Sequence, residues 1–192
     1  MDHCRKIFEE FLDIHDENCL REVEGSARVR VYKKKEIVIR EGEIQSEIPF
    51  IISGSVIGYY LDEGERKCAD CIVDFYGAPI TAASDLEAFI KPSDVYLEAL
   101  ERTEAVCVPT ETIIHIIMAY PEVKASMQRL VTYFLTHHRK MQRMNSAPLP
   151  QRYQMFKELF PELSGRLNMT STAMCLNTSV SALSRLLGEG EK

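Results

Sequence analysis

The sequence predicts an α+β protein in which an antiparallel β-roll, of the cupin or jelly-roll kind, precedes a long helix and a small all-α domain. About eight short β-branched and aromatic runs recur at spacings near ten residues between residues 27 and 108. No Gly or Pro interrupts the stretch from Glu122 to Asn145, which favours one continuous helix. Two short helical patterns separated by Asn177-Thr178-Ser179 end the chain.

The expected elements fall into four parts along the chain. Residues 2–19 place apolar side chains close to a helical period, which predicts an N-terminal helix. From Ala27 the period changes to two, with turn-forming residues between the runs. The expected strands are 29–32, 36–40, 48–52, 55–61, 71–75, 95–100 and 105–108. The predicted parts are the N-terminal helix at 1–20, the roll at 21–109, a short helix and a long dimerisation helix at 110–147, and a helical domain at 148–192.

The long helix carries a heptad pattern of apolar side chains. At 1.5 Å per residue it would be roughly 38 Å long, too long for a small roll alone to cover. Its residues recur at alternating spacings of four and three, which suits pairing with a second helix. The pattern therefore predicts a homodimer, and the alternative is packing on the roll only. The expected dimer interface consists of Val123, Met127, Leu130, Phe134, His137, Met141 and Met144.

The C-terminal part begins with a break at residues 145–150, where two prolines predict a hinge. Residues 151–160 then read as one helix, followed by short helices at about 170–176 and 180–187. Asn177 tolerates the left-handed conformation that ends a helix, and Ser179 can cap the next one. Two short helices with a three-residue turn are typical of a helix-turn-helix. Their expected shared core is Ala173, Leu176, Leu183 and Leu186.

The charge distribution divides the chain in two. The net charge is −6, but residues 138–192 carry eight Lys or Arg against four Glu, or +4, and residues 1–137 carry −10. The acidic total excludes a polycation that coats nucleic acid with its whole surface. The asymmetry predicts two modules with different partners.

No candidate catalytic or metal site emerges from the sequence. It has no evident Ser/His/Asp or Cys/His set and no phosphate-binding Gly-rich loop. Cys68 and Cys71, three apart on a strand, would point to opposite faces and could not share a metal ion. The start lacks a secretory pattern, and the apolar run 113–120 is too short to cross a bilayer. We therefore expect a cytoplasmic protein that is not an enzyme and has no metal, cofactor or membrane partner.

The succession of acidic roll, heptad helix, Pro break and basic helical pair resembles the Crp/Fnr family of bacterial transcription regulators. The segment 49–56, PFIISGSV, is similar to the family's roll signature, an apolar strand that ends in Ser-Gly. Residues 85–101 look like one branch of the family, and 176–186, LNTSVSALSRL, is similar to its DNA-recognition motif. The resemblance covers about residues 5–188. It implies a cyclic-nucleotide-binding-like roll, a homodimer, and DNA as a partner.

The roll departs from the motif of members that bind cyclic nucleotides. Ala78 follows Gly77 where those members have Gly-Glu, and Ser93-Asp94 stands in the place of their Arg-Ser or Arg-Thr pair. An anionic phosphate would meet Asp94 with only Lys91 to compensate, which costs several kcal/mol. We therefore expect no tight binding of cyclic AMP, and either another small-molecule effector or none. The residues expected to line the effector pocket are Gly77, Ala78, Lys91, Ser93 and Asp94.

The second short helix departs from the family pattern as well. Ser181 replaces an acidic residue and Asn177 replaces a Gly, while Arg185 remains to bind a guanine edge or a phosphate. The residues expected to bind DNA are Thr170, Thr178, Ser179, Ser181, Ser184 and Arg185.

A competing hypothesis is an effector-binding or protein-interaction module whose helical tail no longer binds DNA. The two hypotheses differ in their expected surface. A regulator should present one contiguous positive face, whereas a module should scatter these charges. The residues expected to form the positive face are Arg139, Arg143, Arg152, Arg166 and Arg185.

Overall fold

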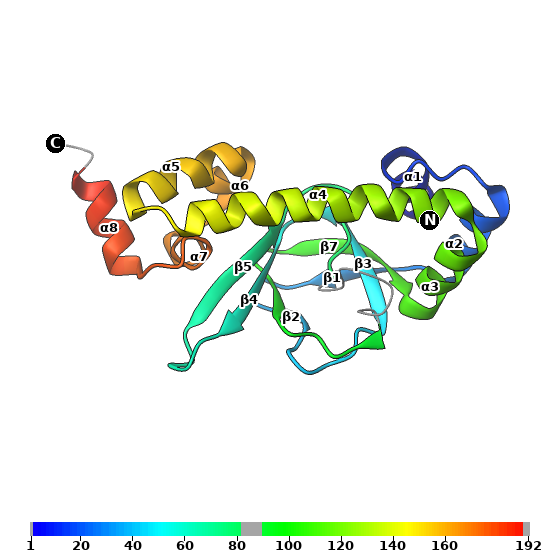
Figure 1. Ribbon diagram of the computed structural model, residues 1–192, viewed down its shortest axis with the longest axis horizontal. Helices are drawn as coiled ribbons and strands as arrows, with labels where there is room; N and C mark the ends of the chain where they lie inside the picture. Colours follow the sequence, from blue (N-terminus) through cyan, green and yellow to red (C-terminus); the bar gives the residue numbers. More distant parts are fainter. Residues whose placement is uncertain (1, 82–89, 190–192) are drawn as a thin grey trace.

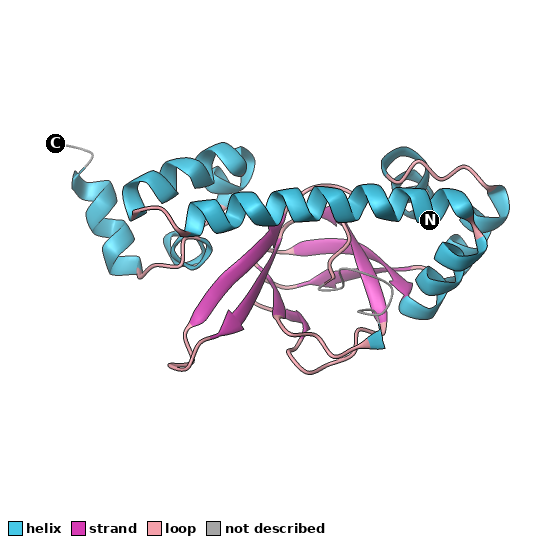
Figure 2. Ribbon diagram, viewed as in Figure 1, coloured by secondary structure: helices cyan, strands magenta, loops and turns pink. Residues whose placement is uncertain are grey.

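The computed structural model describes residues 2–81 and 90–189 and has an α+β architecture (Figure 1). A long helix extends from the N-terminal helices at one end of the molecule, above two antiparallel sheets, to the C-terminal helices at the other end (Figure 2). Within the described residues, no helix is both long and apolar enough to span a membrane. All six cysteines are free thiols.

In the described part of the chain, seven strands form the predicted roll. One sheet has the order β1-β7-β3 and the other the order β2-β6-β4-β5, and all pairs are antiparallel. The strands are β1 (Arg28–Tyr32), β2 (Ile37–Ile39), β3 (Glu47–Ser53), β4 (Val56–Leu61), β5 (Lys67–Val73), β6 (Tyr96–Ala99) and β7 (Thr103–Pro109). The seven expected runs are thus confirmed, except that β5 begins four residues before its predicted start.

Alternate residues of a strand serve two separate cores, as the period of two requires. On β3, Ile51 faces the second sheet and packs in a core with Val56, Leu97 and Ala105. The neighbouring Phe50 points the other way, into a cluster that the N-terminal helices cover. Side chains on both faces of β3 are therefore buried in hydrophobic cores.

The N-terminal region contains three helical elements, so the single helix expected over 2–19 is wrong. They are α1 (Asp2–Lys6), the π-helix η1 (Ile7–Phe11) and α2 (Glu17–Ser26). The helical conformation is interrupted at Asp13, which has a φ of 56°. Asp16 then starts α2 as its N-cap, since its carboxylate accepts hydrogen bonds from the backbone N–H groups of Asn18 and Cys19. Because α2 extends to Ser26, the first strand begins at Arg28, well after the predicted boundary at 21.

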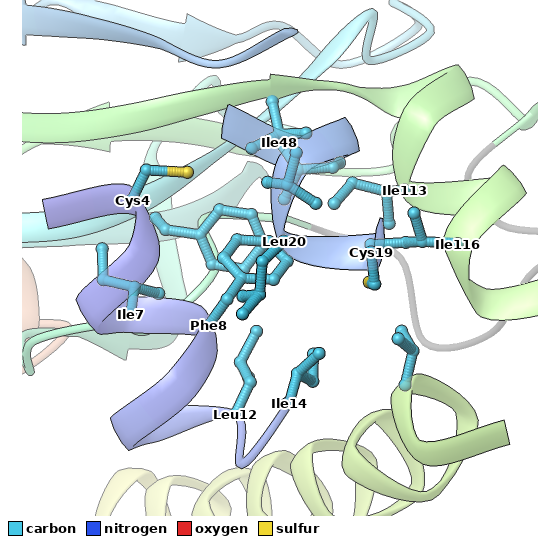
Figure 3. Close-up of a cluster of buried hydrophobic side chains, with 14 of the residues drawn as sticks. Cys4, Ile7, Phe8, Leu12, Ile14, Cys19, Leu20, Ile48, Ile113 and Ile116 are labelled. Atoms are coloured by element: carbon cyan, nitrogen blue, oxygen red, sulfur yellow. The ribbon is translucent and has the colours of Figure 1, made fainter. Parts of the chain in front are cut away.

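The long helix α4 (Pro121–Asn145) has the predicted extent and follows α3 (Thr110–Ala119). Its heptad stripe, however, packs inside its own protomer. Val123, Leu130, Met141 and Met144 are buried in the clusters beneath the helix. Figure 3 shows the cluster next to the N-terminal half of α4, with Phe8, Leu12, Ile14 and Ile116 close together.

The other residues of the expected dimer interface are less buried. Met127 and Phe134 are half-buried against the same cluster, and His137 lies between the rings of Tyr133 and Phe160. The N-terminal helices, the roll and the C-terminal helices thus each cover part of the stripe, and whether it also contacts a second protomer stays a prediction.

The C-terminal part consists of four helices, one more than expected. They are α5 (Leu149–Leu159), α6 (Pro161–Arg166), α7 (Met169–Cys175) and α8 (Val180–Glu189). The predicted break between α4 and α5 is present, but the two parts share one hydrophobic core. Met141 and Met144 of α4 pack in it with Ile57 of the roll and Phe156 of α5. The C-terminal helices are thus docked on the roll.

Candidate functional site

A cavity of about 550 Å³ lies beneath α4. Its volume is in the range of pockets that hold a small molecule. Towards the N-terminal half of α4 its walls are apolar and come from the N-terminal helices, β3, α3 and α4. Representative wall residues are Leu12, Ile14, Phe50, Ile116, Leu130 and Phe134.

Towards the C-terminal half of α4 the same cavity becomes acidic. Asp70 of β5 and Asp94, which precedes β6, both line it, together with the ring of Tyr60. His138 of α4 lies opposite, with its Nδ1 3.9 Å from an oxygen of Asp70. None of the described lining residues is Lys or Arg. This end of the cavity therefore has two carboxylates and no permanently charged cation.

A β-bulge brings Asp70 to the cavity. Gly58 of β4 pairs with Cys71 and Tyr59 pairs with Ala69, so Asp70 is the extra residue between two paired positions. Bulges of this kind redirect a side chain. Burial is the main reason that the pKa of Asp70 lies above its ordinary value, and the charge of Asp94 adds to the increase while His138 opposes it. The carboxylate is thus poorly solvated and gains from a nearby positive charge.

Of the five residues predicted to line the effector pocket, the structure places one, Asp94, in the cavity wall. Gly77 has a φ of 78° and packs so tightly on Phe11 that a Cβ would lie 2.6 Å from that ring. Ala78 is fully buried in the core between the sheets, where its carbonyl accepts from the N–H of Ile51. The Ser93 hydroxyl donates to the carbonyl of Val95.

Lys91 is exposed and is not among the residues that line the cavity. The motif positions 85–89 lie outside the described residues. The prediction missed Asp70, Tyr60 and His138; the signal for Asp70 was Gly58, since a Gly inside a strand often marks a bulge.

At the opposite end of the molecule, α7 and α8 form the predicted helical pair. Asn177 in the turn has a φ of 48°, and the Ser179 hydroxyl accepts from the N–H of Ala182 to cap α8. Ala173, Leu176 and Leu183 are buried in the shared core. The free side of the pair is exposed and carries Thr170, Ser179, Ser181, Ser184 and Arg185, while Thr178 is half-buried.

The turn of this helical pair is bound to the roll through Asn177. Its Oδ1 accepts from the N–H of Ala69 at 2.6 Å, and its Nδ2 donates to the carbonyl of Ala69 at 3.1 Å. Because β5 is the last strand in its sheet, Ala69 presents both backbone groups outward, where no strand pairs with them. Asn145 of α4 donates to the same carbonyl. The Asn that replaces the family's Gly thus attaches the turn to β5.

The contiguous positive face expected of a regulator is not formed by all five arginines. Arg152 donates to the backbone carbonyls of Ala147 and Leu176, and so stabilises the turn from inside. Arg166 pairs with Glu101 of the roll at 3.0 Å. Arg139 and Arg143 on α4 and Arg185 on α8 are exposed. Two of the five arginines are therefore bound to groups of the same protomer.

Comparisons with known proteins bear on the whole arrangement. No protein-family profile and no curated protein sequence matches the chain. A Crp/Fnr-family structure from Eubacterium rectale is similar at a TM-score of 0.77 and 16% identity, over 97% of this chain and 88% of that one. This chain has the Crp/Fnr fold.

Two further structures share the Crp/Fnr fold. CLP, the c-di-GMP-responsive global regulator of Xanthomonas campestris, has a TM-score of 0.71 at 16% identity and covers 92% of each chain. FixK2 of Bradyrhizobium japonicum has a TM-score of 0.67 at 15% identity, over 85% of this chain and 83% of its own. The Crp/Fnr likeness extends through the N-terminal helices, the roll, α4 and the C-terminal helices.

Proposed function

We propose that this chain is a cytoplasmic, homodimeric transcription regulator that binds DNA through α8, and not an enzyme. The observation that carries the proposal is the α7–turn–α8 pair at the free end of a Crp/Fnr fold. Figure 1 shows α7 and α8 at one end of the molecule, and the exposed residues of this pair include three serines and Arg185. Hydroxyl and guanidinium groups are the donors that bind phosphates and guanine edges.

DNA recognition would place the start of α8 in the major groove. There Ser179 and Ser181 would donate to phosphates or bases, and Arg185 would bind a guanine edge or a phosphate. Since few cations neutralise phosphates, we expect modest affinity with a shallow dependence on salt. Two copies of α8 about 34 Å apart would reach successive major grooves of a near-palindromic site.

We infer that the dimer uses a different stripe of α4 from the buried heptad positions. A second set of residues on the exposed side also recurs at spacings of three and four. Leu135 is 54% exposed there, although exposed leucines are costly in water. The members of this stripe are Gln128, Val131, Leu135, His138 and Gln142, of which Gln128, Leu135 and Gln142 are exposed, and Val131, Leu135 and His138 also line the cavity beneath α4. Paired stripes of this kind would hold two protomers in parallel.

The cavity beneath α4 supports the effector-sensing role of the roll. Its acidic end opposes cyclic AMP, because the phosphate would face Asp70 and Asp94 without an arginine to pair with. Bound between roll and helix, another effector would shift the orientation of α8 relative to α4.

The test of DNA binding is fluorescence anisotropy with labelled genomic fragments at low salt. The wild-type chain should bind, and Arg185→Ala should weaken binding at least tenfold. Arg40→Ala, a change of the same type on an exposed turn of the roll, should leave binding unchanged. Absence of binding by the wild-type chain would contradict the proposal.

The alternative function, an interaction module without DNA binding, is favoured by one observation. Arg152 binds backbone carbonyls and the exposed Arg166 is paired with Glu101, so the charge expected of a DNA-binding face is reduced. The same anisotropy experiment decides between the two. Equal affinities of the wild-type chain and Arg185→Ala would favour the module.

A further inference from the structure

We propose that the cavity beneath α4 binds an organic ammonium ligand, with its cationic head between Asp70 and Asp94 and its apolar body under the helix. This inference rests on the effector role proposed for the roll, but it does not require that α8 binds DNA. It specifies the charge and the shape of the ligand, which the comparison with the cyclic-nucleotide-binding motif left undefined.

The acidic end of the cavity has the composition of an ammonium site. Two carboxylates from different segments, Asp70 on the bulge of β5 and Asp94 before β6, line the same space. The ring of Tyr60 lines it as well, and aromatic faces attract cations. Together these residues bring two carboxylates and one aromatic side chain to the same cavity.

In the structure, the nearest basic side chain to Asp70 in the cavity is an imidazole. His138 approaches Asp70 to 3.9 Å, too far for a hydrogen bond. An ammonium head with its own N–H donors would satisfy the carboxylate at hydrogen-bonding distance, which the imidazole does not do. Because Asp70 is half-buried, this exchange is worth more than the same pairing in water.

Anionic ligands are excluded by the same arrangement. No Lys or Arg occurs among the described residues that line the cavity. A carboxylate or phosphate placed at this end would therefore lose its hydration and face two negative charges. The cost of such an unpaired anion is several kcal/mol.

The rest of the cavity requires an apolar ligand body. Phe134 lies on α4 between the two ends, and Leu130, Ile116 and Leu12 continue the wall towards the N-terminal helices. Ser126, a polar residue of α4 in this wall, has its hydroxyl already bound to the carbonyl of Leu12. A hydrocarbon or aromatic group would thus be buried without loss of hydrogen bonds.

The test is titration calorimetry of the full chain at neutral pH with three probes of one shape. They are phenethylammonium, 2-phenylethanol and 3-phenylpropanoate, which differ in the charge of the head. The cation should bind at least tenfold more tightly than the alcohol, and the anion should not bind. Equal or tighter binding of the anion, or no binding of the cation at millimolar concentration, would overturn the proposal.

Substitutions of the two aspartates test whether the cationic head of the ligand binds at the acidic end of the cavity. Asp70→Asn should weaken phenethylammonium binding at least tenfold and leave 2-phenylethanol unchanged, and the exposed Asp94→Asn should act in the same direction. Glu63→Gln, an exposed change in the β4–β5 turn, is the control and should have no effect. Unchanged affinity of both Asp variants for the cation would contradict the assignment. Since no DNA is present, failure here leaves the DNA-binding proposal standing.

Discussion

Asn177 combines two properties that a residue in a helix-turn-helix turn rarely needs together. It adopts a left-handed backbone conformation, as a Gly would, and its carboxamide binds both backbone groups of Ala69. Sequence analysis predicted the first property from the residue type. The second depends on the edge of β5, 108 residues away, and no local pattern indicates it.

Asn177→Gly isolates the carboxamide, because Gly keeps the backbone conformation without strain. Loss of two hydrogen bonds should lower the free energy of unfolding by roughly 1–3 kcal/mol. Denaturant unfolding followed by circular dichroism measures the difference. Lys35→Gly, at another residue with positive φ, corrects for the added flexibility of Gly. Equal losses in the two variants would show that the contact with Ala69 contributes nothing.

The burial of His137 predicts how the free energy of unfolding depends on pH. Its Nε2 is buried without a hydrogen-bond partner among the described residues, and burial is the main reason that its pKa is lowered, with Lys140 and His138 contributing. The unfolded chain therefore binds a proton more readily than the folded one as the pH falls below about 6.5. The free energy of unfolding should decrease from pH 7 to pH 5.

The variant His137→Phe keeps a ring between Tyr133 and Phe160 but cannot be protonated. Between pH 7 and pH 5, the free energy of unfolding of this variant should decrease less than that of the wild-type chain. His15→Asn, at an exposed position, should reproduce the wild-type slope. Identical slopes for His137→Phe and the wild-type chain would refute this role of burial.

At the scale of elements, patterns that are local in the sequence predict where strands and helices lie, but not the surfaces against which they pack. β-branched runs and turns located the strands, since both signals are local. The N-terminal region was predicted as one helix because its apolar residues fit one period, yet Asp13 and Asp16 divide it. Likewise, the α4 heptad pattern predicted a buried stripe correctly but could not say which surface covers it.

The bulge in β5 depends on Gly58 of β4. A Cβ at this position would lie 2.5 Å from the Cys71 sulfur, so the two strands approach closely where Asp70 is extruded. Gly58→Ala should lower the free energy of unfolding by about 1–3 kcal/mol through overpacking. Addition of Cys71→Ala removes the sulfur and should restore part of the loss. A double variant no more stable than Gly58→Ala would contradict this explanation.

At the scale of the whole molecule, the proposed dimer would form through the exposed side of α4. Leu135→Glu should convert the dimer to a monomer in sedimentation velocity, because it places a charge at the centre of the proposed interface. Met118→Glu on α3 is the matched control, since Met118 is 78% exposed and lies off α4. A wild-type chain that sediments as a monomer, or a dimer unaffected by Leu135→Glu, would rule out this interface.

The sequence order of the parts was enough to predict the α+β architecture and the position of the helical pair. The docked arrangement was not predictable, because it rests on contacts between distant segments. The shared core of Ile57, Met144 and Phe156 joins the roll, α4 and α5, and the Arg166–Glu101 pair adds a polar link. The same arrangement explains why two predicted surface cations, Arg152 and Arg166, are bound to groups of the same protomer.

Selection of binding sites from a random DNA library by the full chain tests whether α8 binds DNA as one half of a symmetric pair. We predict enrichment of an inverted repeat with half-sites about one helical turn apart, and loss of the enrichment in Arg185→Ala. A library that stays random after repeated selection by the wild-type chain would contradict the account.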